Sequence, residues 1–321
     1  MKKLFLGVLI LGISLAISPA AQAAEYGVYV KVAEKVTGSF ADAVKNAETA
    51  LAKDGWQVLA SYDAAVPEGC GFKAHTIVVD SAAYAQKIMA HGPRSAFALP
   101  LRVAVFTDEK GINTSFLNPA SLNRTVLGDT TEKDLSVKTM QELSGILAAA
   151  TKGTVVNQQI GELRSKGHVG GMGGGAFTEK ITEIYKKEDA GSNFRDIAAK
   201  VKEGILANTK GWRLVYSLDL GKDVVIYGVD NRKTEARAFG IAGEKRESKS
   251  NPCPGIDHAP AFPVEVVVMK DRGVVKVVTL DEMYRMKVYF EDAGNWAFMK
   301  NMRMPGEIER EIVEMSRAKL K

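Results

Sequence analysis

The stretch of sequence that decides the fold occurs twice. It reads Gly55-Trp56-Gln57-Val58-Leu59-Ala60-Ser61-Tyr62-Asp63, and it returns as Gly211-Trp212-Arg213-Leu214-Val215-Tyr216-Ser217-Leu218-Asp219. Glycine, tryptophan, serine and aspartate keep the same spacing in both stretches. Each glycine follows a helical pattern, where a left-handed residue caps a helix, and an apolar strand begins at each tryptophan. The pair therefore predicts a duplicated helix–turn–strand unit.

The match extends to both sides of this stretch. Before each glycine, apolar residues recur on one helical face: Phe40, Val44, Ala47 and Leu51, then Phe194, Ile197, Val201 and Ile205. After it, residues 77–80 parallel residues 227–230, and Pro100 and Pro263 each precede a strand that leads to a hairpin turn. Each copy ends in an amphipathic helix, which in the second copy begins near Pro305.

These patterns predict an α+β protein of two similar two-layer repeats. Each repeat is a mainly antiparallel sheet with helices packed on one face. The expected boundaries are a signal peptide at 1–23, a first repeat at 24–150, a Gly-rich linker at 151–178 and a second repeat at 179–321. Residues 167–175 also suggest a phosphate cradle, but polar residues stand where a strand should precede it, so a flexible linker is favoured. No Gly-x-Gly-x-x-Gly follows a strand, which excludes a Rossmann fold.

The N-terminus has the pattern of an export signal. Lys2 and Lys3 precede an apolar run that ends at Ile17, and small residues lead to a cleavage site after Ala23. The apolar run is shorter than the ~20 residues that a spanning helix needs. We therefore expect an exported, soluble protein of the periplasm or the extracellular space, with no membrane span once the signal is removed.

The composition and net charge of the chain limit the classes of partner that we expect it to bind. Apolar residues make up 46% of the chain and charged residues 25%, which is ordinary for a globular protein. The formal charge of +5 includes Lys2 and Lys3, and neither repeat is basic enough for a nucleic-acid surface. A small ligand or a protein partner is expected instead. We also expect the two repeats to pack together as a pseudo-dimer within the chain, because a single small sheet has edges and an open face that favour pairing.

Each copy resembles the domain of unknown function (DUF) number 302. The resemblance rests on the helix leading into Gly-Trp with a following Asp, on the strand-then-helix at Val79 and Val229, and on the prolines at 100 and 263. It implies a compact α+β fold with a tendency to pair and no established activity. In many members that this chain resembles, a cysteine comes just after that proline. In this chain, Leu101 and Val264 occupy the position. A thiol or metal role suggested by those cysteines is therefore not carried over.

The two cysteines, Cys70 and Cys253, lie elsewhere. They are candidates for a disulfide, because export places them where disulfides persist. Two other interpretations stay open. In one, Cys253 and His258 are metal ligands; in the other, His258 activates a reactive thiol for redox chemistry.

The methionines are unevenly distributed. Five of the eleven fall between residues 283 and 304: Met283, Met286, Met299, Met302 and Met304. Thioethers are soft ligands that suit Cu(I), so these residues form a candidate copper site, alone or with Cys253 and His258. Methionine also fills apolar cores, and core packing is the favoured interpretation.

No motif specifies a reaction, and no cofactor or catalytic residue is predicted. His75 lies in a strand pattern without a serine or cysteine at a meaningful spacing, so a packing role is expected. Asp63 and Asp219 recur at equivalent positions and are interpreted as turn residues at strand ends. The sequence thus favours a non-catalytic protein that binds a ligand or partner, with a soft-metal site or a thiol-dependent redox role as alternatives.

Overall fold

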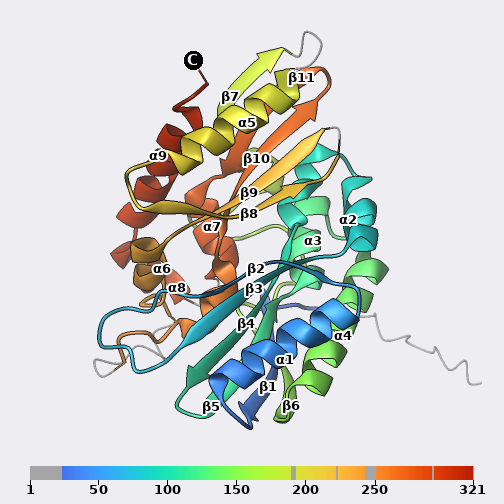
Figure 1. Ribbon diagram of the computed structural model, residues 1–321, viewed down its shortest axis with the longest axis vertical. Helices are drawn as coiled ribbons and strands as arrows, with labels where there is room; N and C mark the ends of the chain where they lie inside the picture. The colour runs from blue at the N-terminus through green and yellow to red at the C-terminus, as the bar shows by residue number, and fades with distance from the viewer. Residues whose placement is uncertain (1–23, 189–192, 222, 243–250, 291–292, 321) are drawn as a thin grey trace, which may run out of the picture.

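The computed structural model describes residues 24–188, 193–221, 223–242, 251–290 and 293–320. The predicted signal peptide, 1–23, lies outside them. Two antiparallel sheets form the two halves of the chain, lower and upper in Figure 1. We call residues 24–180 the first half and residues 181–320 the second half. Within the described residues, no helix has both the length and the apolar character needed to cross a membrane.

The first half holds a six-stranded sheet of order β2-β3-β4-β5-β1-β6. Its strands are β1 (Tyr29–Val36), β2 (Gln57–Asp63), β3 (Ala74–Asp80), β4 (Leu101–Asp108), β5 (Gly111–Leu117) and β6 (Thr154–Ile160). Its helices are α1 (Phe40–Lys53), α2 (Ala82–Met89), α3 (Pro119–Leu127) and α4 (Lys133–Ala150), with 3-10 turns η1 (Pro93–Ala98) and η2 (Phe177–Glu179). Helices α1 and α4 pack together over one face of the sheet.

The second half repeats this order, and its described residues form no counterpart of β6. Read from β8, its sheet runs β8-β9-β10-β11-β7. The strands are β7 (Ile181–Glu188), β8 (Trp212–Asp219), β9 (Val224–Asn231), β10 (Val264–Asp271) and β11 (Val274–Leu280). The helices are α5 (Asn193–Leu206), α6 (Arg232–Ala238), α7 (Glu282–Tyr289), α8 (Gly294–Lys300) and α9 (Arg303–Arg317), with the 3-10 turn η3 (Ile256–Ala261). The α+β class and the antiparallel sheets expected from the sequence are confirmed.

The two halves share details finer than strand order. The β2–β3 ladder shifts register between Val58 and Ala60, and the β8–β9 ladder shifts between the matching Leu214 and Tyr216. Gly55 has φ +85°, and Gly211 has φ +86°. Gly55 follows the end of α1 closely, as predicted. Helix α5 ends earlier, at Leu206, so Gly211 is not its capping residue.

The range predicted as a flexible linker is folded in part. Residues 154–160 form β6, which pairs with β1. Further on, the buried Arg164 donates to the carbonyls of Lys166 and Gly167, and the Gly167 amide donates to Asp129. The glycine-rich turn itself closes through a bridge between Val169 and Gly175. Because these backbone groups find protein partners, the segment packs onto the first half.

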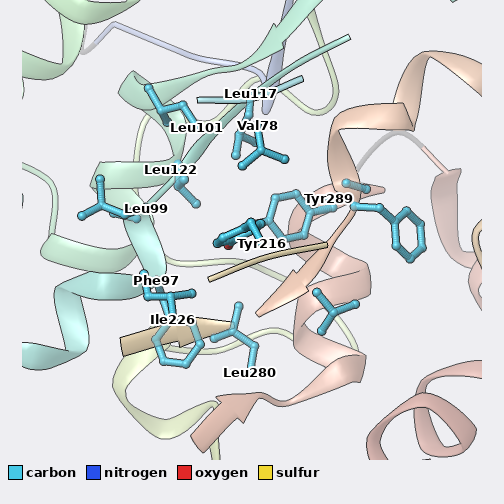
Figure 2. Packing of buried hydrophobic residues seen from close by; sticks show 14 of the residues in the cluster. Val78, Phe97, Leu99, Leu101, Leu117, Leu122, Tyr216, Ile226, Leu280 and Tyr289 are labelled. Carbon is cyan, nitrogen blue, oxygen red and sulfur yellow. The ribbon is translucent and has the colours of Figure 1, made fainter. Parts of the chain in front are cut away.

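The halves contact each other reciprocally. Turn η1 of the first half packs on β10, and turn η3 of the second half packs on β4. Apolar residues of both halves form one continuous core, in which Leu101 and Val78 lie near Tyr216 and Tyr289 (Figure 2). At its centre the equivalent strand positions Arg102 and Glu265 form an ion pair, with both side chains almost completely buried.

The repeated tryptophans occupy matching places. Trp56 and Trp212 are buried, and each donates its indole N–H to a glutamate on the last long helix of its half, Glu142 at 3.0 Å and Glu311 at 2.9 Å. Replacing either by alanine removes a large buried ring, so we expect a loss of about 3–5 kcal/mol in the free energy of unfolding, measured with denaturant. Trp296 is 53% exposed and is the matched control. A loss for Trp56→Ala no larger than for Trp296→Ala would contradict this packing.

Candidate functional site

A cavity of about 790 Å³ lies in the first half. Helix α1 forms one side, strands β2 and β3 contribute their ends, and residues 64–73 between these strands form the remaining wall. We call residues 64–73 the wall loop. The lining is apolar over much of its area, through Phe40, Ala41, Val44, Ala64, Val66, Phe72 and Ala74. Such a cavity with a few polar groups is the usual form of a small-molecule site.

Three polar residues that line this pocket, Glu48, Asp63 and His75, belong to a hydrogen-bonded chain that also includes the exposed Ser61. Asp63 Oδ1 lies 2.7 Å from Nδ1 of His75, and Nε2 of His75 lies 2.6 Å from the Ser61 hydroxyl. Ser61 also donates to the Glu48 carboxylate of α1. The β2–β3 register explains the arrangement, because it pairs Asp63 with His75, and residues two apart on a strand share a face.

This chain has the connectivity of a serine, a base and a residue that orients the base. An imidazole that donates from Nδ1 to Asp63 presents Nε2 to Ser61. The Ser61 hydroxyl carries one proton and has two acceptors beside it, His75 and Glu48. The sequence interpretation of His75 as a packing residue without a nearby serine is wrong in this respect. The alternation of side chains along β2 places Ser61 and Asp63 on one face, and the β2–β3 register pairs Asp63 with His75. These two signals together could have identified the group.

Two lysines also line the pocket. Among the described residues, neither Lys45 nor Lys73 forms an ion pair, whereas the carboxylates of Glu48 and Asp63 are engaged by Ser61 and His75. The positive charges are therefore the ones available to a ligand. The pocket combines an apolar interior with cationic side chains at its polar rim.

In the described part of the second half, two of the features that form this pocket are replaced. Arg195 stands on α5 where Ala41 stands on α1, and its guanidinium pairs with Asp219, the counterpart of Asp63, and donates to the Gly221 carbonyl at 2.6 Å. In addition, β8 and β9 are joined by residues 220–223 only, so no counterpart of the wall loop exists. Val225 replaces His75, while Ser217 is retained.

The second half instead holds the wall loop in place. Cys70 of the loop is disulfide-bonded to Cys253, with a Cα–Cα distance of 5.8 Å. The Ala65 amide donates to Glu235 of α6 at 2.6 Å. Ala64 belongs to an apolar cluster with Phe239 and Cys253, on which Val66 and Phe72 also pack. One side of the pocket is thus fixed by the neighbouring half.

The positions of Cys253 and His258 bear on the metal and thiol roles considered from the sequence. Because the Cys253 sulfur is bonded to Cys70, it offers no thiol for His258 to activate. His258 is buried, with its ring 4.9 Å from the Phe290 ring in an edge-on contact. Among the described residues, no group of three or more histidine, cysteine, aspartate or glutamate side chains is placed to hold a metal ion.

The methionines divide between core and surface. Met286 and Met304 are buried in the apolar core, and Met283 packs against it. Met299 and Met302 are exposed, at 54% and 45%. Core packing, the interpretation favoured from the sequence, describes three of the five.

The carboxylate that anchors the wall loop is sensitive to pH. Burial, together with the negative charge of Asp230, raises the pKa of Glu235 to about 8 from its ordinary 4.5. Between these two values the folded chain binds more protons at this site than the unfolded chain. The contribution of Glu235 to the free energy of unfolding is therefore highest below about pH 4.5, and it falls as the pH rises toward 8.

We expect Glu235→Gln to reduce this pH dependence, because glutamine keeps an oxygen for the Ala65 amide and cannot ionise. The wild-type slope from this group is at most about 1.4 kcal/mol per pH unit. Denaturant unfolding at pH values from 5 to 8 measures it. Glu307→Gln is the control, because Arg237 lowers the pKa of this exposed carboxylate out of that range. An equal slope in wild type and Glu235→Gln would refute the assignment.

Comparison with known proteins agrees with the resemblance in the first half. Residues 32–150 match the family described as "Domain of unknown function DUF302". A solved structure, "Crystal structure of uncharacterized conserved protein DUF302 from Bacillus stearothermophilus", is similar at 16% identity, covering 37% of this chain and 95% of that chain, with a TM-score of 0.33. No curated protein matches. The family match covers α1, β2 and β3, which form the pocket.

Proposed function

We propose that the chain binds a small molecule with an apolar body and one anionic group in the pocket of its first half. The observation that carries this proposal is the pocket of about 790 Å³, with its apolar lining and the side chains of Lys45 and Lys73. Burial of an apolar body supplies the affinity, and the ammonium groups favour a carboxylate or similar head group.

In this proposal the second half is a second copy of the same fold that supports the first. The support is the common strand order, the matching register shifts and the paired tryptophan–glutamate hydrogen bonds. The second copy has exchanged a pocket for the Arg195–Asp219 pair, and it contributes the disulfide and Glu235 that hold the wall loop.

Export also belongs to the proposal. The basic and apolar N-terminus supports it, and a disulfide between Cys70 and Cys253 suits an oxidising compartment. N-terminal sequencing of the protein from its native host tests this. Recovery of chains that still begin at Met1 would contradict cleavage after Ala23.

The pocket can be closed by copying the second half. We expect Ala41→Arg to place a guanidinium beside Asp63, as Arg195 lies beside Asp219, and to fill the cavity. Octanoate, an apolar chain with one carboxylate, is a suitable probe. Its affinity, measured by isothermal titration calorimetry, should fall at least tenfold in Ala41→Arg, which corresponds to about 1.4 kcal/mol.

Asn46→Arg is the matched control, because Asn46 is exposed on the same helix and does not line the pocket. It adds the same charge without filling the cavity. Equal affinities in wild type and Ala41→Arg would count against this pocket as the binding site, as would an equal loss in both arginine variants.

A further inference from the structure

We propose that Ser61 is a nucleophile, activated by His75, that cleaves carboxylic esters whose apolar acyl group lies in the pocket. This inference rests on the proposed binding function and names its substrate class. The product would be an apolar carboxylate, the same chemical class that the pocket is proposed to bind.

The geometry supplies the three roles that acyl transfer to serine requires. His75 Nε2 lies 2.6 Å from the Ser61 hydroxyl, within reach for taking its proton. Asp63 lies 2.7 Å from Nδ1 and is a positioning residue, which holds the ring with Nε2 toward Ser61. Lys45 and Lys73 line the pocket beside His75, and within this proposal we assign to their positive charge the stabilisation of the oxyanion.

The reaction is balanced without a cofactor. Ser61 Oγ attacks the ester carbonyl carbon while Nε2 of His75 takes the hydroxyl proton. The tetrahedral intermediate collapses, the carbon–oxygen bond to the alcohol breaks, and His75 returns the proton to the leaving alkoxide. Water then attacks the acyl–Ser61 ester while His75 takes its proton, the bond between the acyl carbon and Ser61 Oγ breaks, and His75 returns the proton to Oγ. The carboxylic acid that leaves ionises in water to the carboxylate.

Glu48 competes with His75 for the Ser61 proton, because both accept from the same hydroxyl. A glutamine at 48 would donate its amide N–H to Ser61 and leave the hydroxyl proton for His75. Glu48→Gln therefore tests whether Glu48 or His75 takes the Ser61 proton. If Glu48 were the base, its replacement and not that of His75 would abolish reactivity.

The chain contains its own control for the serine. Ser217 occupies the equivalent position in the second half and is exposed like Ser61, but Val225 stands where His75 stands. An activated serine is therefore expected at 61 and not at 217. A fluorophosphonate, which phosphonylates activated serines, is the probe, with the adduct located by peptide mass spectrometry.

We expect one adduct per chain, on Ser61. Ser61→Ala should abolish it, and His75→Gln should slow labelling by about 10²–10⁴-fold, the usual contribution of a general base. Ser217→Ala should label as wild type, whereas Glu48→Gln should label faster, because the competing acceptor of the Ser61 proton is removed. Asp63→Asn should slow labelling and the conservative Asp63→Glu should restore part of it, because a carboxylate at this position holds the imidazole with Nε2 toward Ser61. Thermal unfolding checks that each variant is folded.

Labelling of Ser217 at the rate of Ser61, absence of labelling in the wild type, or loss of labelling in Glu48→Gln with retention in His75→Gln would each overturn the inference. The binding function is tested separately by octanoate titration of Ser61→Ala. If that variant binds octanoate while wild type is not labelled, the nucleophile assignment fails and the pocket stands. If no variant binds octanoate, the pocket function itself fails.

Discussion

Arg102→Leu is expected to lower the free energy of unfolding by about 3–5 kcal/mol, because it leaves the Glu265 carboxylate buried at the centre of the molecule without its charge partner. Arg102 also donates to the Pro263 carbonyl at 3.1 Å and to the Tyr289 hydroxyl at 2.8 Å, so three groups of the second half lose a donor. Burial alone would lower the pKa of Arg102, but the negative charge of Glu265 holds this pKa above its ordinary value, so the side chain stays charged.

The double variant Arg102→Leu/Glu265→Leu separates the pair from its surroundings. Since both charges are then removed, the loss should be much smaller than for either single replacement, and the coupling energy from the four unfolding curves should exceed about 2 kcal/mol. The exposed pair Lys210–Glu314 is the matched control, and its coupling should be far smaller because solvent screens both charges. Additive losses at Arg102 and Glu265 would show that the two do not form the central contact between the halves.

Removal of the disulfide should be the other large effect. Cys70 and Cys253 are 183 residues apart in the sequence, so their bond restricts a long segment of the unfolded chain. The double replacement by alanine is expected to cost about 2–5 kcal/mol, measured by denaturant unfolding. Alanine is chosen because Cys253 lies buried among apolar residues.

The same replacement should weaken octanoate binding, because the bond anchors the wall loop that carries Val66 and Phe72. Treatment with a reductant should produce both effects in the wild type and neither in the double variant. A loss of less than about 1 kcal/mol in the free energy of unfolding, with unchanged octanoate affinity, would show that the second half does not hold the wall loop through this disulfide.

Much of the fold was predictable because it depends on local periodicity. The Gly-Trp stretches, the helical faces before them and the prolines at 100 and 263 predicted two similar α+β units and their antiparallel hairpins. The helix end before Gly211 was misplaced because Asn208 supplies another termination there, donating to the carbonyls of Ile205 and Trp212. Strand β6 was missed because its residues carry no clear apolar alternation.

The site was harder to predict because it depends on tertiary relations. The spacing of 14 residues between Ser61 and His75 has no meaning until the β2–β3 register is known. The cavity arises from a small residue, Ala41, whose importance is visible only beside Arg195 in the other half. Cys70 and Cys253, the two cysteines of the chain, were candidates for a disulfide, but the position of their bond beside the pocket depends on how the halves pack.

The central claim is that one small-molecule pocket, in the first half, is the functional site. A methyl NMR titration of the full chain with octanoate tests it most directly, because Ala41, Val44, Ala64, Val66 and Ala74 provide methyl groups around the cavity. We predict chemical-shift changes at these residues, saturation at one octanoate per chain, and their loss in Ala41→Arg. Shift changes confined to Ala198 and Val225 of the second half, or to the exposed Met299 and Met302, would contradict the claim.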